Sequence, residues 1–168
     1  MELAYVAGLF DGEGSVGLYQ GPLGGWNFRV QLVQNESVEA RALWMAMADR
    51  WGGHVSRARS ANGRAKMNWQ LGQECAAAFL RDIRPWLILK SEQVDVALGW
   101  LERRPVLRHD PATGRRLARS ADDLEDTKAV AARLKRLKRE DIDVVMDDAR
   151  DLVEIRHTLH QIVNVKGD

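Results

Sequence analysis

The sequence predicts an α+β protein whose core follows the order helix, strand, strand, helix, strand, strand, helix (αββαββα), with further helices at the C-terminus. Residues 15–34 and 54–71 each alternate apolar and polar side chains around a turn-forming stretch, which is typical of antiparallel hairpins with one buried face. The segments around these hairpins carry apolar residues at helical spacing. The 168 residues, 45% of them hydrophobic, suffice for one ordinary globular core with an appended helical piece.

Composition excludes several classes of protein. Cys75 is the only cysteine, so the chain has no intramolecular disulfide and no Cys-rich zinc site. No apolar window approaches the roughly 20 residues needed to cross a bilayer, so we expect a soluble, intracellular protein with no membrane partner. Arginine outnumbers lysine by 19 to 6, which favours a bacterial or phage origin and a cytoplasmic, nucleoid-associated location.

The formal net charge of +1 hides an uneven distribution along the chain. Residues 106–139 carry ten Lys/Arg and five Asp/Glu, whereas residues 140–168 carry three and eight. Such local charge matters because fields act over a Debye length of about 10 Å. We expect a core over residues 1–104, a loop over residues 105–120 and a C-terminal helical extension over residues 121–168.

The first helix ends in an unusual stretch, AYVAGLFDGEGSV at residues 4–16. Its large apolar side chains are expected to pack on the domain's own core: Tyr5, Leu9 and Phe10. Its small residues form a strip that lets a second backbone approach: Ala4, Ala7 and Gly8. Gly12 and Gly14 are expected to release the chain, which holds Glu13 at the C-terminal end of the helix.

The remaining elements follow in order. Strands are expected at residues 15–20 and 26–34, joined by a Gly- and Pro-containing turn. A helix over residues 37–51 begins with Ser37 as its N-cap and ends at Gly52-Gly53. Residues 54–60 and 64–71 form the second hairpin, and helices follow at 74–83 and 91–103, separated by Pro85.

The polar faces of the two hairpins point to nucleic acid. Residues 14–34 and 53–72 contain five cationic residues and no acid. Asn, Gln and Arg offer the paired hydrogen bonds that distinguish base edges, and a two-stranded ribbon fits the major groove of DNA. Arg57 and Arg59 share the parity of Val55, so they need exposure beyond the core or a bulge. The expected contacts to bases or backbone are Ser15, Tyr19, Asn27, Arg29, Gln31, Arg57, Arg59, Arg64, Lys66, Asn68 and Gln70.

The position of Glu13 predicts a metal site. If two such helices pack about a twofold axis, two carboxylates meet near two helix C-terminal dipole ends, and this arrangement is unfavourable without cations. Mg²⁺ prefers carboxylate, carbonyl and water oxygens, which Glu13 and the carbonyl of Gly12 supply. Mn²⁺ or Ca²⁺ could replace Mg²⁺ for binding.

Residues 6–14, VAGLFDGEG, resemble the motif of LAGLIDADG homing endonucleases. The order of elements over residues 2–104 is also similar to that family's saddle of antiparallel strands backed by helices. The resemblance implies that the motif helices form the dimer interface, that Glu13 binds the catalytic metal with help from the Gly12 carbonyl, and that Asp11 is structural. It also implies catalytic positions for Gln34, at the end of the second strand, and for Lys90, after a Pro-aromatic-Leu segment.

A single motif implies a homodimer, and a C2 dimer prefers a palindromic or pseudo-palindromic duplex. The sequence therefore predicts a Mg²⁺-dependent, site-specific DNA endonuclease of the kind that mobilises introns or inteins. The alternative is a non-cleaving protein on the same fold, either an intron maturase with an RNA partner or a DNA-binding regulator. Retention of Glu13, Gln34 and Lys90 favours the enzyme.

The C-terminal extension divides into a basic and an acidic part. A helix over residues 121–139 ends in cations that could contact phosphates flanking the target: Arg136, Lys138 and Arg139. A second helix is expected over residues 140–163, and its acids would repel DNA. We expect this second helix to fold back or to join a partner.

Overall fold

The computed structural model describes residues 2–21, 25–60, 62–103 and 120–140. The chain divides into two compact units, Met1–Leu134 and Lys135–Asp168. The predicted loop at 105–120 and the predicted helix at 140–163 lie almost entirely outside the described residues. No helix within the described ranges is both long and apolar enough to cross a bilayer.

The first unit has the predicted αββαββα order. Its elements are α1 (Leu3–Glu13), β1 (Gly14–Gln20), β2 (Trp26–Asn35), α2 (Val38–Trp51), β3 (His54–Arg59), β4 (Ala65–Leu71), α3 (Gln73–Ile83), the 3₁₀ turn η1 (Arg84–Trp86) and α4 (Ser91–Arg103). Ser37 caps α2 as expected, since its side chain accepts a hydrogen bond from the Ala40 amide at 3.0 Å.

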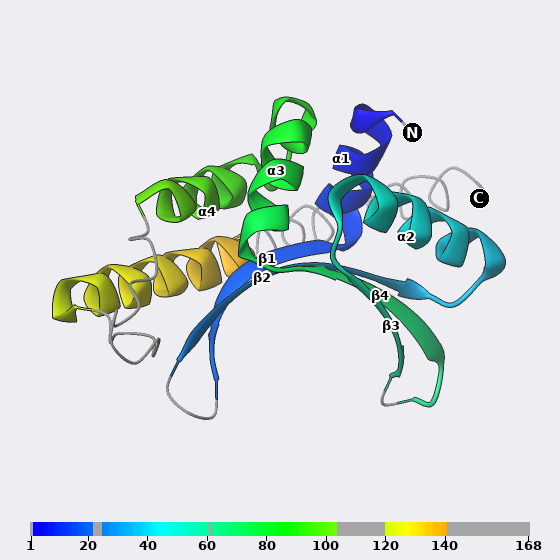
Figure 1. Cartoon of the computed structure of the whole chain (residues 1–168), viewed down its shortest axis with the longest axis horizontal. Coiled ribbons are helices and arrows are strands. Elements are labelled where there is room, and N and C mark those ends of the chain that lie inside the picture. Colours follow the sequence, from blue (N-terminus) through cyan, green and yellow to red (C-terminus); the bar gives the residue numbers. More distant parts are fainter. Residues whose placement is uncertain (1, 22–24, 61, 104–119, 141–168) are drawn as a thin grey trace, which may run out of the picture. The chain divides into compact units, whose positions relative to one another are not determined.

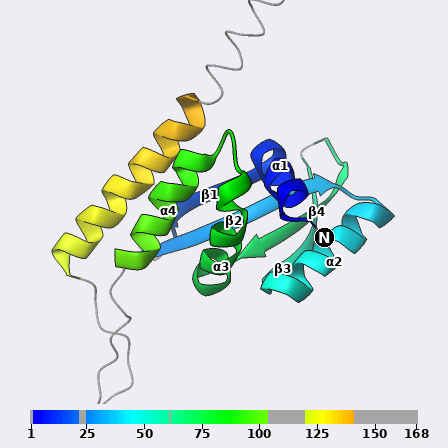
Figure 2. The same cartoon turned by 90° about the horizontal axis from the view of Figure 1, so that it is seen from above.

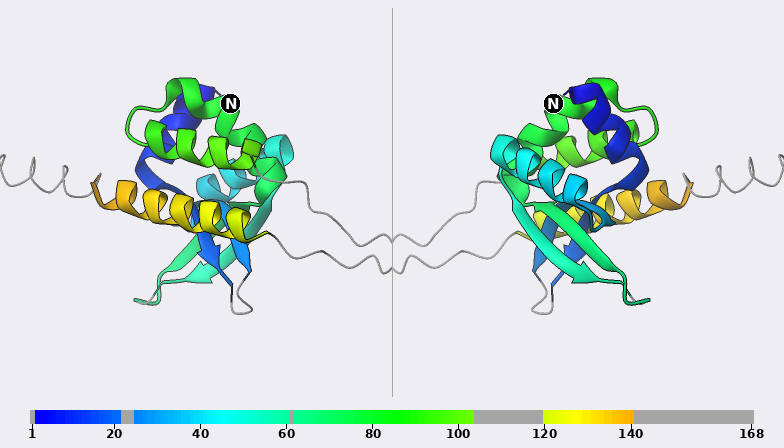
Figure 3. Two further views of the ribbon diagram at one scale, coloured as in Figure 1. Left: turned by 90° about the vertical axis from the view of Figure 1, so that its left-hand side faces the viewer. Right: turned by 90° about the vertical axis from the view of Figure 1, so that its right-hand side faces the viewer.

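The four strands form one antiparallel sheet in the order β1-β2-β4-β3. The sheet is arched, and α1 to α4 lie on its convex side (Figure 1). Seen from above, the helices cross over the strands and cover them (Figure 2). The concave side is flanked by the tips of the two hairpins (Figures 1 and 3).

The convex face of the sheet carries the core. Val16, Val30 and Leu32 are fully buried, and Trp69 and Leu71 continue the same face on β4. The Trp69 ring packs edge-on against Phe79 of α3, with ring centroids 5.1 Å apart. Its indole Nε1 donates to the Gly52 carbonyl at 2.9 Å, so this large side chain is buried with its polar atom satisfied. The predicted alternation of strands β1, β2 and β4 is thereby confirmed.

Residues 121–140 form a further helix, and its part within the first unit packs beside α4 (Figures 2 and 3). Trp100 of α4 donates from Nε1 to the Thr127 hydroxyl at 3.3 Å. Val130 and Leu134 are buried in the core of the same unit. Residues 121–134 of the predicted C-terminal extension are therefore integrated with the core through apolar contacts.

The end of α1 differs from the expectation in one respect. Gly12 remains helical, and the chain leaves the helix at Gly14, which is extended with φ −77°. A Cβ on Gly14 would overlap the Phe10 ring and lie 2.6 Å from the Phe10 carbonyl oxygen. Gly14 is therefore required by close packing against Phe10, not by a left-handed backbone.

We expect Gly14→Ala to lower the free energy of unfolding by about 1–3 kcal/mol, because an added methyl must displace the buried Phe10 ring. Gly25→Ala is the matched control, since a Cβ there meets nothing within 4 Å. Urea unfolding followed by circular dichroism measures both. Equal stabilities for the two variants would contradict the packing explanation.

Candidate functional site

The C-terminal end of α1 is joined to the loop between η1 and α4 by a reciprocal set of hydrogen bonds. The Asp11 carboxylate accepts the backbone amides of Ile88 at 2.8 Å and Lys90 at 2.9 Å. In return, the Lys90 ammonium donates to the carbonyls of Phe10, at 3.1 Å, and Asp11. We call these contacts the Asp11–Lys90 clasp. They agree with the structural role expected of Asp11.

The three predicted catalytic residues belong to elements that meet near the C-terminal end of α1. Glu13 ends the helix and is exposed. Gly14 pairs with Leu32, so Gln34, two residues beyond Leu32, belongs to the same end of the β1–β2 ladder. The Gln34 side chain is half-buried and accepts from the Asn35 amide at 3.2 Å. Lys90 reaches this region through the Asp11–Lys90 clasp.

The donors at the end of α1 fit a divalent cation of the Mg²⁺ type. The last four carbonyls of a helix lack partners within the helix. The Lys90 ammonium donates to those of Phe10 and Asp11. The Gly12 carbonyl and the exposed Glu13 carboxylate are hard oxygen ligands. Among the described residues no three His, Cys, Asp or Glu side chains gather into a metal-binding group, so this part of one chain offers only part of a metal site.

The exposed side of α1 is not the strip expected from the sequence. Ala7 is fully buried, whereas Tyr5 is 59% exposed, so the predicted roles of these two residues are reversed. Ala4 and Gly8 are exposed as expected. The prediction was wrong because the helix turns Val6, Ala7 and Phe10 toward the sheet and α3, and only these neighbours determine its rotation about its own axis.

The concave face of the sheet is open and polar. Register places residues from all four strands on it, and each except Gly17 is at least partly exposed: Ser15, Gly17, Tyr19, Asn27, Arg29, Gln31, Val33, Asn35, His54, Ser56, Ala58, Lys66, Asn68 and Gln70. One row across the sheet joins Ser15, Gln31, Gln70 and His54. The side-chain oxygens of Ser15 and Asn68 are buried with no hydrogen-bond partner among the residues that the structure describes.

His54 and Ser56 also lie on the polar face, although neither is among the residues predicted to lie there. Both lie on the edge strand β3, where His54 pairs with Gln70 and Ser56 with Asn68. The sequence could have predicted this position, because the two neighbours of Val55 in a strand point to the face opposite to Val55. The residues predicted to make contacts from this strand were Arg57 and Arg59, which share the parity of Val55.

Arg57 and Arg59 lie on the convex-face parity of β3, opposite Met67 and Ala65. The ladder runs without a bulge, and both side chains are exposed because the hairpin extends past the core. Arg57 Nε pairs with a Glu36 carboxylate oxygen at 2.6 Å. A hollow of about 230 Å³ is lined by these arginines with Ala58 and Ala65. Arg64 is exposed beside the hairpin turn.

The predicted C-terminal cations belong to the second unit, of which the structure describes only residues 135–140. Arg136 and Arg139 are exposed on the helix there. Arg136 pairs with Glu140 one turn later, at 3.3 Å. Lys138 is half-buried. These residues remain predicted phosphate contacts.

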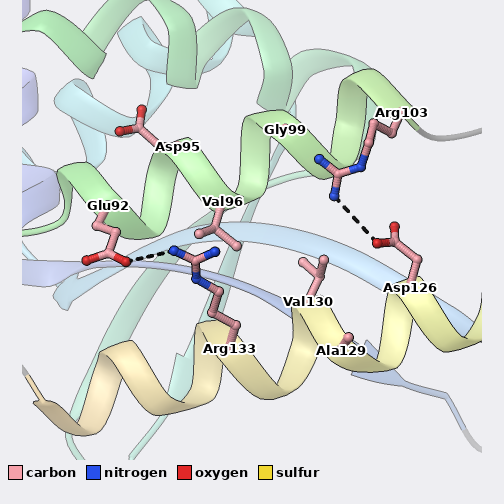
Figure 4. Close-up of a pocket in the computed structure, with 9 residues that line it drawn as sticks. All are labelled: Glu92, Asp95, Val96, Gly99, Arg103, Asp126, Ala129, Val130 and Arg133. Carbon is pink, nitrogen blue, oxygen red and sulfur yellow. Dashed lines mark hydrogen bonds and ion pairs between the residues drawn. The ribbon is translucent and has the colours of Figure 1, made fainter.

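A larger cleft lies elsewhere, between α4 and the helix of residues 121–134 (Figure 4). It measures about 560 Å³. Its charged side chains face one another across the cleft: Arg133 pairs with Glu92 at 3.0 Å, and Arg103 with Asp126 at 3.5 Å. Because acids and cations alternate within it, this cleft offers no field of one sign that would attract a polyanion.

No protein-family profile matches the chain, and no curated protein matches it. Solved structures, in contrast, match the chain. The homing endonuclease I-CvuI, in complex with its target in the presence of Ca, has a TM-score of 0.57 at 15% identity over 80% of each chain. The archaeal intron-encoded homing endonuclease I-Vdi141I, complexed with DNA, has a TM-score of 0.53 at 15% identity over 80% of this chain and 82% of that one. At these identities the similarity shows a shared fold.

The Asp11–Lys90 clasp generates a prediction about stability. We expect Asp11→Asn to lower the free energy of unfolding by about 1–3 kcal/mol, because one of the two backbone amides loses a charged acceptor. Asp49→Asn, on the exposed side of α2, removes the same charge and should change stability by less than about 0.5 kcal/mol. Chemical denaturation at one protein concentration compares them. A stable Asp11→Asn protein would show that the clasp contributes little.

Proposed function

We propose that this chain, which has the fold of the LAGLIDADG homing endonucleases, is a homodimeric, site-specific DNA endonuclease that cleaves both strands of a long pseudo-palindromic duplex. The observation that carries the proposal is the exposed Glu13 carboxylate at the end of α1, next to a concave polar sheet face. Hydrolysis of a phosphodiester needs both a place for the backbone and a ligand for the metal. This arrangement offers both in one region.

The concave face is the proposed DNA surface. Its cations are Arg29 and Lys66, Arg57 and Arg59 lie on the other parity of the edge strand, and strands β1 to β4 contain no Asp or Glu. Amide and hydroxyl side chains between these cations can read base edges. The solved structures of I-CvuI and I-Vdi141I hold DNA, which supports the same use of the fold here.

Two features support the homodimer. Gly8 and Gly12 lie on the exposed side of α1, and a Cβ on either would meet nothing within 4 Å of its own chain. Glycine inside a helix costs about 1 kcal/mol relative to alanine, so a closely approaching partner backbone is the physical reason for their presence. Exposed apolar side chains continue this surface onto the loop bound by Asp11: Trp86 at 53%, Ile88 at 83% and Leu89 at 61%.

The second subunit also completes the chemistry. One Glu13 and one Gly12 carbonyl would hold Mg²⁺ together with the same pair from the partner subunit. When bound, Mg²⁺ would stabilise negative charge on the phosphate oxygens and lower the pKa of water. Gln34 orients water by hydrogen bonding, and the Lys90 ammonium stabilises charge that develops on the scissile phosphate. Lys90 can do so because the Asp11–Lys90 clasp already holds it at the end of α1.

Replacing Glu13 tests the metal assignment. We expect Glu13→Gln to lower Mg²⁺-dependent cleavage of a selected duplex by at least about 100-fold, the scale on which loss of one electrostatic stabiliser acts. Duplex binding should change little, since the charge lost repels DNA. Glu2→Gln at the other end of α1 is the control and should cleave normally. Purified Glu13→Gln protein with undiminished cleavage would eliminate the assignment.

A wild-type protein that binds duplex in a salt-dependent way but never cuts it with any divalent metal would instead favour the non-cleaving regulator. Preference for a structured RNA over duplex DNA would favour the maturase. Cleavage and binding are therefore measured on the same preparation, with both nucleic acids.

Arg59 generates a separate prediction about the DNA backbone. It lies on the edge strand, turned away from the concave face, and no ion pair holds it within the described residues. We expect Arg59→Ala to weaken binding equally for all sequences and to reduce the slope of log K against log salt by about 1. Arg81→Ala on α3, at the convex side, is the control. An unchanged slope would mean that Arg59 only protects the sheet edge.

A further inference from the structure

Three residues on the concave face of the β1–β2 hairpin form one stacked arrangement. Gly17 pairs directly with Arg29, and Tyr19 lies two residues further along β1 on the same face. A Cβ on Gly17 would lie 3.0 Å from Tyr19 Oη and 3.1 Å from two of its ring carbons. The Tyr19 ring therefore lies back over the bare backbone of Gly17. The guanidinium carbon of Arg29 is 5.3 Å from the centroid of that ring.

This arrangement limits the movement of Arg29. An arginine side chain on a sheet surface normally samples many rotamers, and stacking on an aromatic face restricts them. Gly17 makes room for the ring, because a Cβ there would lie 3.0–3.1 Å from it and would require the ring to shift. Arg29 is half-buried as a result, although it lies on the open face.

The contact with Tyr19 leaves donors of Arg29 available. A guanidinium has five N–H donors in one plane, and contact with a single ring cannot engage all of them. No carboxylate pairs with Arg29 in the part of the chain that the structure describes, and strands β1 and β2 contain no Asp or Glu. An oriented planar pair of donors matches the O6 and N7 acceptors of guanine in the major groove.

We propose that Arg29 is a specificity-determining residue that reads a guanine in each half of the duplex target, with Tyr19 and Gly17 as positioning residues. The inference rests on the proposed function, since it needs a DNA duplex on the concave face. A phosphate contact would not need this arrangement, because phosphate accepts a cation from many directions. Lysine would serve a phosphate equally well, but it lacks the planar pair of donors.

The test is a selection of binding sites from randomised duplexes with the full chain in Ca²⁺, followed by sequencing. Wild-type sites should contain guanine at one position in each half-site. Arg29→Lys should lower that preference by about tenfold, within the 5- to 150-fold range of one bidentate contact, and should keep the salt dependence because the charge remains. Gly17→Val should weaken the same preference by displacing the ring.

Tyr19 supplies a matched pair of variants. Tyr19→Phe keeps the ring and should keep the guanine preference, whereas Tyr19→Leu removes the ring and should lose much of it. This pair also keeps the test decisive if Gly17→Val fails to fold. Circular dichroism and an unchanged unfolding midpoint establish that each selected variant is intact.

Three outcomes would overturn the proposal. Arg29→Lys with an unchanged site profile would show that the planar donors are not used. Arg29→Ala that reduces the salt slope by about 1 with an unchanged profile would assign Arg29 to a phosphate. A wild-type chain that selects no duplex would remove the proposed function and this inference together, whereas selective wild-type binding without an Arg29 effect would remove only the inference.

Discussion

The Asp11–Lys90 clasp is the contact on which the candidate site depends. A helix ends with carbonyls that need partners, and in α1 a lysine some 80 residues away in the sequence supplies them. The carboxylate of Asp11 holds the loop that carries this lysine. Because residues two apart on a helix point in nearly opposite directions, Asp11 faces this loop and Glu13 does not. Two acids two residues apart therefore have different surroundings, since Asp11 holds the loop and Glu13 is exposed.

The sheet separates stability from recognition by its two faces. The convex face buries large apolar side chains under the helices, and the concave face carries amides, hydroxyls and cations. A slip of one residue in register would exchange the two sets. Trp69 opposes such a slip, since its ring packs on Phe79 and its indole nitrogen binds Gly52. The packing that stabilises the fold thus also sets which side chains lie on the concave face.

The charged residues are also distributed differently between the helices and the sheet. Ion pairs within and between helices neutralise acids on the helical side, as with Arg81–Glu102 and the two-bonded Arg84–Asp95 pair at 2.5 and 2.6 Å. The hydrogen bonds from Arg84 lower the pKa of the Asp95 carboxyl. These exposed pairs add little stability individually. The strands, by contrast, contain no Asp or Glu, although the net charge of the whole chain is only +1.

The sequence by itself determined the order of the elements, the parity of β1, β2 and β4, and the motif that brings Glu13 to a helix end. These features follow from local periodicity and from residues adjacent in the chain. Tertiary structure alone determined that Ala7 is buried and Tyr5 exposed, that Arg57 and Arg59 are exposed on an edge strand without a bulge, and that the Tyr19 ring lies close to both Gly17 and Arg29. The physical reason is that the rotation of a helix and the neighbours of an edge strand are set by packing between distant segments, which local patterns do not encode.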